Sequence, residues 1–187
     1  MKADGMENVP SDSARQLRGR LLLGLAALVV LLVLMQGVAL WPRLPERIPV
    51  HFGLTGEPDG WSGKGWFSVF GLLGLAAVLL ITFGAASSRL LGARYYNFPG
   101  KERVLKLPRE QQDYVLSPLR EGMAWLGSSV AIAMALMARE SWQVALGQRA
   151  GMPVWVFMVA FGVGVAAVIV GIVQANLRAG EAGTSDR

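Results

Sequence analysis

The chain has 187 residues but no cysteine and only one histidine, His51. The absence of cysteine excludes disulfides and thiolate metal sites. Charged residues are scarce, at 17% compared with roughly 25% in an average soluble domain, whereas 53% of the residues are hydrophobic. The net charge of +5 is compatible with nucleic acid binding, but the charges lie in the gaps between long apolar runs. We therefore expect the lipid bilayer, and no nucleic acid, as a partner.

Four runs contain no charged residue: 21–40, 65–88, 122–138 and 150–177. A bilayer core of about 30 Å needs about 20 helical residues, and roughly 17 to 25 are tolerated. The runs therefore predict an all-α integral membrane protein with four transmembrane helices. The third run is the weakest, because Gly127, Ser128 and Ser129 dilute it. The alternative for this run is a buried helix that lies on the other three.

Positively charged residues predict the orientation of the spans. Of the 18 Lys and Arg, 13 lie before the first run, between the second and third runs, or in the tail. Such an excess marks the cytoplasmic side, so both termini are predicted to be cytoplasmic. Tryptophan anchors at headgroup interfaces and supports the same orientation. Five of the six tryptophans cluster at the opposite side: Trp41, Trp61, Trp66, Trp142 and Trp155.

The runs and gaps divide the chain into five parts. Residues 1–17 are expected to be a disordered cytoplasmic N-terminus, and residues 18–88 to hold the first two helices with an extracytoplasmic loop at 41–64. A cytoplasmic basic segment at 89–121 precedes the third and fourth helices at 122–177, and a cytoplasmic tail follows at 178–187.

Two details of helix packing are predicted as well. Tyr114, Val115, Pro118 and Leu119 recur at helical spacing, which predicts a short interfacial helix that bends near Pro118 into the third span. In the fourth run, Gly162 and Ala166 form a pair of small residues. Such a pair favours close helix packing, either inside the protein or across a dimer.

The extracytoplasmic loop carries the one recognisable motif. Residues 44–64 read L-P-x-x-I-P-x-H-F-x-x-x-G-x-x-D-x-x-x-x-K between two spans. This pattern resembles the bacterial membrane family known as domain of unknown function 1648 (DUF1648), which includes SdpI-type immunity proteins. The resemblance covers about residues 20–90. It implies a multi-pass protein of the bacterial cytoplasmic (inner) membrane, and SdpI-type members protect a cell against a secreted peptide toxin.

The candidate ligand-binding residues all lie in this loop: His51, Asp59, Lys64, Glu57 and Gly56. One interpretation is a site for a ligand or a peptide. A second is a divalent metal held by His51 and one or two carboxylates, although one imidazole without thiolates is a thin ligand set. A third is structural: Asp59 accepts backbone N–H bonds in its own turn, while His51 and Lys64 tie the loop down. We do not expect a metal site.

Four classes of function remain to be weighed. A transporter is disfavoured because no span contains an ionisable residue, whereas such residues mark ion pathways in membranes. An enzyme is disfavoured because there is no recognised catalytic motif, so we expect no catalytic residues and no cofactor. The preferred hypothesis is a non-enzymatic protein that binds a ligand or peptide through its outer loop. The alternative is an accessory subunit of a larger membrane complex, with other membrane protein subunits as partners.

The predicted topology can be tested with reporter fusions. Reporters after Gly60 and Gly147 should lie outside the cytoplasm, and those after Lys101 and Arg187 inside, because of the distribution of positive charge. Alkaline phosphatase is active only after export, so activity of the Lys101 fusion would contradict this topology.

Overall fold

The computed structural model describes residues 12–182, which form four long helices and several short elements. The long helices are α1 (Asp12–Leu40), α2 (Trp66–Ser87), α4 (Arg109–Ala145) and α5 (Val154–Ala182). The short elements are the 3₁₀ helices η1 (Trp41–Arg43) and η2 (Ala93–Tyr95), the strands β1 (Arg47–Phe52) and β2 (Pro58–Gly63), and the helix α3 (Lys101–Val104). Each long helix is long and apolar enough to cross a membrane. This confirms the prediction of a multi-pass membrane protein.

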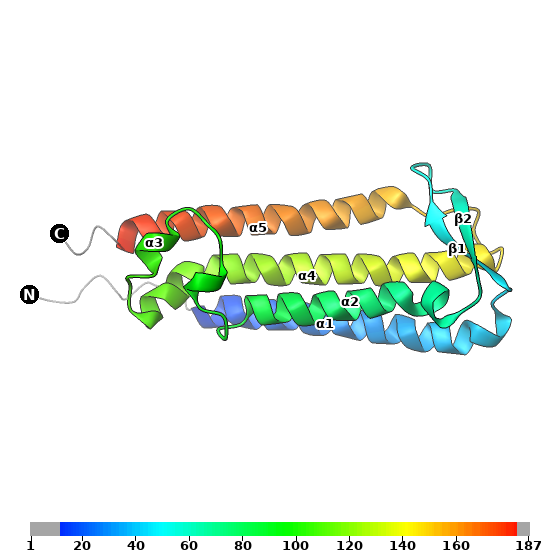
Figure 1. The fold of residues 1–187 in the computed structure, drawn as a ribbon, viewed down its shortest axis with the longest axis horizontal. Helices are drawn as coiled ribbons and strands as arrows, with labels where there is room; N and C mark the ends of the chain where they lie inside the picture. The colour runs from blue at the N-terminus through cyan, green and yellow to red at the C-terminus, as the bar shows by residue number, and fades with distance from the viewer. Residues whose placement is uncertain (1–11, 183–187) are drawn as a thin grey trace, which may run out of the picture.

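The long helices form an elongated bundle (Figure 1). α1 begins and α5 ends at the same end of the bundle, where η2 and α3 also lie. The two strands lie at the opposite end, beside the connection between α4 and α5. Within the described residues, the first and the last helix therefore have their outer ends on one side of the bundle, as the sequence predicted. Which side faces the cytoplasm stays a prediction.

α4 is the central helix, since it packs against α1, α2 and α5. Of the most apolar 18-residue stretch of α4, 44% is buried inside the protein, compared with 22% of the corresponding stretch of α1, the next most buried helix. The small side chains of Ala124, Ala131 and Ala135 are fully buried and allow close approach of the neighbouring backbones. Two of the residues that weaken this run as a lipid-facing segment are also suited to the middle of the bundle: Ser128 is buried, and a Cβ at Gly127 would overlap the side chain of Phe83.

Glycines set the contact between α4 and α5. A Cβ atom at Gly122 would lie 2.6 Å from the carbonyl oxygen of Ala167, and one at Gly171 would lie 2.7 Å from that of Pro118. The pair of small residues predicted in α5, Gly162 and Ala166, does not pack inside the protein, and its packing across a dimer stays a prediction. Nothing lies within 4 Å of a Cβ at Gly162, and Ala166 is exposed.

The expected short helix before the third span is instead the beginning of α4, a single helix of 37 residues that contains Pro118. Pro118 has no N–H, so the carbonyl of Tyr114, four residues earlier, loses its helical donor. Arg178 of α5 donates a hydrogen bond to this carbonyl at 2.6 Å, and Ser117 Oγ donates another at 3.1 Å. Because the freed carbonyl has new partners, the helix continues through the proline.

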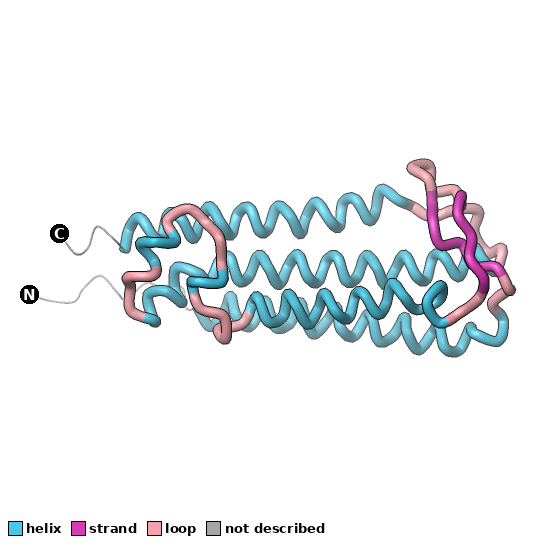
Figure 2. The backbone as a smooth tube through the Cα atoms, viewed as in Figure 1, coloured by secondary structure: helices cyan, strands magenta, loops and turns pink. Residues whose placement is uncertain are grey.

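The outer loop also differs from the expectation of an all-α fold, because it contains an antiparallel hairpin (Figure 2). β1 and β2 pair with Ile48 opposite Ser62 and Pro49 opposite Trp61, and the register shifts on either side of His51. The fold is mostly helical, with this two-stranded sheet as its only described β-structure.

Candidate functional site

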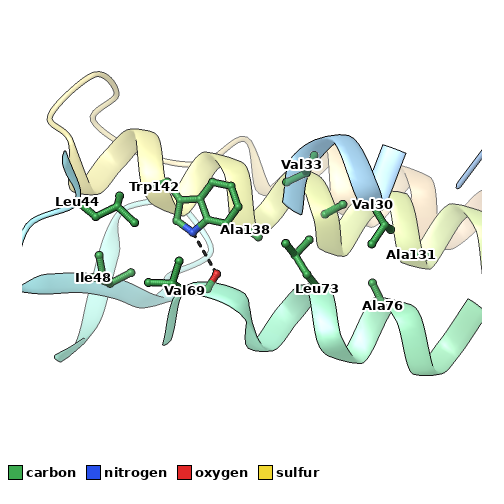
Figure 3. Packing of buried hydrophobic residues seen from close by; sticks show 11 residues of the cluster. Val30, Val33, Leu44, Ile48, Val69, Leu73, Ala76, Ala131, Ala138 and Trp142 are labelled. Carbon is green, nitrogen blue, oxygen red and sulfur yellow. Dashed lines mark hydrogen bonds between the residues drawn. The ribbon is translucent and has the colours of Figure 1, made fainter. Parts of the chain in front are cut away.

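The hairpin rests on α4 through buried contacts at the end of the bundle (Figure 3). Trp142 of α4 has no exposed surface and packs in one cluster with Leu44 and Ile48. Its Nε1 donates a hydrogen bond to the carbonyl of Val69 at 3.2 Å. The neighbouring Ser141 Oγ donates to the carbonyl of Pro49 at 2.6 Å. The first strand is therefore fixed to the central helix by both packing and a hydrogen bond.

The tip of the hairpin is held by backbone contacts with the connection between α4 and α5. Gly56 is buried, has a φ of 88° and accepts a hydrogen bond from the Met152 amide at 2.8 Å. A Cβ atom at Gly56 would overlap the carbonyl oxygen of Met152. Both the positive φ and the close approach require glycine here. Gly56 thus docks the tip of the hairpin onto the connection between α4 and α5.

His51 and Asp59 form a pair across the two strands. His51 Nδ1 and Asp59 Oδ1 are 2.5 Å apart, and their side chains are 73% and 53% exposed. The described hydrogen bonds of the Asp59 carboxylate include none from a backbone N–H, so the predicted capping of its own turn is wrong. The prediction that these two residues interact is confirmed, and the pair lies on a surface open to solvent.

Lys64 and Glu57 have different surroundings from this pair. Lys64 Nζ donates to the carbonyl of Leu44 at 2.9 Å and lies 5.3 Å from the centroid of the Trp41 ring. Lys64 therefore closes the base of the hairpin, as the structural interpretation predicted. Glu57 is exposed, and its carbonyl accepts a hydrogen bond from the Gly53 amide at 2.9 Å. Across residues 12–182, no three histidines and carboxylates lie close enough together to hold a metal ion.

Beneath the hairpin lies an apolar groove of about 780 Å³, a feature that the sequence analysis did not predict. Its walls come from both strands, from α2, from α4 and from Met152. Val50, Phe52, Leu72 and Leu75 are among its apolar lining residues. None of the described residues that line the groove is titratable. Gly71 and Gly74 also line it, and these two glycines among Phe67, Leu72 and Leu75 are the sequence signal for a hollow at this place.

The docking of the hairpin tip can be tested at Gly56. Gly56→Ala should expose the Met152 amide, because alanine disfavours the left-handed conformation and its Cβ would overlap the Met152 carbonyl. We expect hydrogen exchange at this amide to become at least about tenfold faster, which corresponds to about 1.4 kcal/mol. Gly63→Ala is the matched control, since a Cβ at Gly63 meets nothing within 4 Å. Equal protection of Met152 in the two variants would contradict the assigned contact.

Comparisons with known proteins agree with the motif in the hairpin. No curated protein and no solved structure matches the chain. The family model described as DUF1648, a domain of unknown function, matches residues 28–77. The matched segment covers the second half of α1, the whole hairpin and the first half of α2. It thus contains all five candidate residues of the loop and most of the segment that forms the groove. Residues 28–77 are therefore similar to the DUF1648 family.

Proposed function

We propose that this protein is a non-enzymatic component of the bacterial cytoplasmic membrane that binds an amphipathic peptide in the groove beneath its extracytoplasmic hairpin. The observation that carries the proposal is the groove itself. Its volume of about 780 Å³ lies within the range of roughly 300 to 1,000 Å³ that is usual for ligand sites. The wall is formed by both strands of the hairpin together with α2, α4 and Met152, so the groove depends on the docked hairpin.

The chemistry of the wall favours apolar groups. The hydroxyls of Ser68 and Ser141 line the groove but already donate to the carbonyls of Gly63 and Pro49. The indole N–H of Trp142 donates in the same way to Val69. A charged or strongly polar ligand group would find few free partners here and would lose its hydration. Aliphatic or aromatic side chains of a ligand would bury apolar surface instead.

Features of the hairpin and of the start of α2 offer the ligand further contacts. The exposed His51–Asp59 pair lies on the same hairpin, and Trp66 and Phe67 are 71% and 90% exposed at the start of α2. β2 has only β1 as a described partner, so its other edge can pair with an extended peptide. The resemblance to SdpI-type immunity proteins, which act against a peptide toxin, also favours a peptide.

The groove lacks the side chains that catalytic turnover of a ligand by acid–base chemistry would need. General acid–base catalysis requires a titratable side chain within hydrogen-bond reach of the reacting group. The described residues that line the groove have no such side chain, and the His51–Asp59 pair is not among them. A ligand in the groove would therefore be bound and released unchanged.

A groove-filling substitution tests this function. Gly74→Phe should place a ring in the groove, since Gly74 lines it and a Cβ there meets nothing within 4 Å. A copy with this change should fail to complement a deletion strain while it accumulates normally in the membrane. Gly24→Phe is the control, because Gly24 of α1 is also exposed with open space around it but lies outside the groove.

Full complementation by Gly74→Phe at normal abundance would refute a role for the groove. Co-purification with other membrane proteins in fixed stoichiometry, unchanged by Gly74→Phe, would favour the accessory-subunit alternative instead.

A further inference from the structure

A second cavity lies at the other end of the bundle, between α1, α2 and α4. Its volume is about 180 Å³, far above the roughly 10 to 15 Å³ that one water molecule requires. Four arginines line it: Arg15, Arg20, Arg89 and Arg120. This cavity is distinct from the groove beneath the hairpin, with which it shares no residue.

The carboxylates near this cavity do not balance its positive charge. Glu121 binds Arg15 at 2.8 Å and Arg18 at 3.2 Å. Asp113 binds Arg120 at 2.8 Å and lies 3.9 Å from Arg89. Arg20 has no described ion-pair partner. Among the described residues, two carboxylates thus face the four lining guanidinium groups and that of Arg18, so the cavity keeps a positive potential that attracts anions.

Arg120 places a buried hydrogen-bond donor at the wall of the cavity. Its side chain is only 4% exposed. One terminal nitrogen donates to Asp113, and the other donates to the carbonyl of Leu91 at 3.0 Å. The remaining donor, Nε, is buried and has no acceptor among the described residues. An unpaired buried donor on a charged group is costly, so this guanidinium gains from an anion beside it.

The position of these arginines along the chain places the cavity at the depth of lipid headgroups. Arg20 comes directly before the uncharged run 21–40, and Arg89 directly follows the run 65–88. Arg120 lies two positions before the run 122–138. The cavity therefore sits where three apolar segments end, which is the level of the phosphates in a bilayer.

We propose that this cavity is a phosphate-binding site that takes the headgroup phosphate of an anionic phospholipid. Guanidinium groups match phosphate oxygens in geometry and bind them with paired, charge-assisted hydrogen bonds. The bound phosphate joins the ends of α1, α2 and α4, because α1 and α4 contribute lining arginines and Arg89 lies two residues after the end of α2. This site is independent of the peptide-binding function proposed for the opposite end.

The test compares lipid binding by two double variants of the full chain in detergent. Arg20→Gln with Arg89→Gln removes two cavity arginines, and Arg103→Gln with Arg109→Gln removes two exposed arginines outside the cavity. Native mass spectrometry with added phosphatidylglycerol should show about tenfold weaker binding for the cavity variant, because two charge-assisted contacts are lost. The control variant should bind as the unchanged chain does. Phosphatidylcholine should bind more weakly than phosphatidylglycerol to the unchanged chain.

The same titrations include inorganic phosphate as a competitor. Displacement of phosphatidylglycerol at millimolar phosphate would support the site with free phosphate as its ligand, and no displacement would support the lipid headgroup. Equal binding of the two lipids, or equal losses in the two double variants, would overturn the proposal. If the cavity variant does not fold, Arg20→Gln alone is compared with the control variant in the same titrations. Arg20 has no described ion-pair partner, so its replacement breaks no described ion pair.

Discussion

The side chain of Trp142 extends from α4 where three helices and the hairpin meet, and its indole has no exposed surface. The ring faces Phe70 of α2 edge-on, with 6.1 Å between the ring centroids, and donates its N–H to the α2 backbone. On the side of α1, a Cβ at Gly37 would lie 2.5 Å from the indole. One side chain therefore sets the spacing of α1, α2 and α4. Because Ser141 holds β1 beside it, the position of the hairpin and the shape of the groove depend on this contact.

The two ends of the bundle use polar groups in different ways. Near the hairpin, the hydroxyls of Ser68 and Ser141 and the indole N–H of Trp142 donate to backbone carbonyls, which leaves a mostly apolar wall. At the opposite end, arginines outnumber the carboxylates that face them, and one buried guanidinium nitrogen has no described acceptor. Apolar ligand groups suit the first environment, and anions suit the second.

The sequence predicted the features that depend on composition along the chain. Uncharged runs identified the four membrane-spanning helices, because the length of a span is set by the bilayer and not by tertiary contacts. From the motif in the loop, the contact between His51 and Asp59 was also predicted correctly. The continuation of α4 through Pro118 was not predictable, because it depends on Arg178, which is 60 residues away in the sequence and donates to the carbonyl that the proline leaves free. The burial of α4 was predicted only as the alternative for the third run, since small residues weaken a lipid-facing pattern but favour helix packing.

The groove could not be predicted, because it consists of space left between segments that meet only in the folded chain. Its direct test is photo-crosslinking in living cells from a benzoylphenylalanine at Leu75, which lines the groove and is 46% exposed. Leu28 of α1, which is 50% exposed outside the groove, is the control position. The account predicts a peptide adduct at Leu75 that is absent at Leu28 and is lost when Gly74→Phe is added. Phospholipid adducts alone, at both positions, would contradict it.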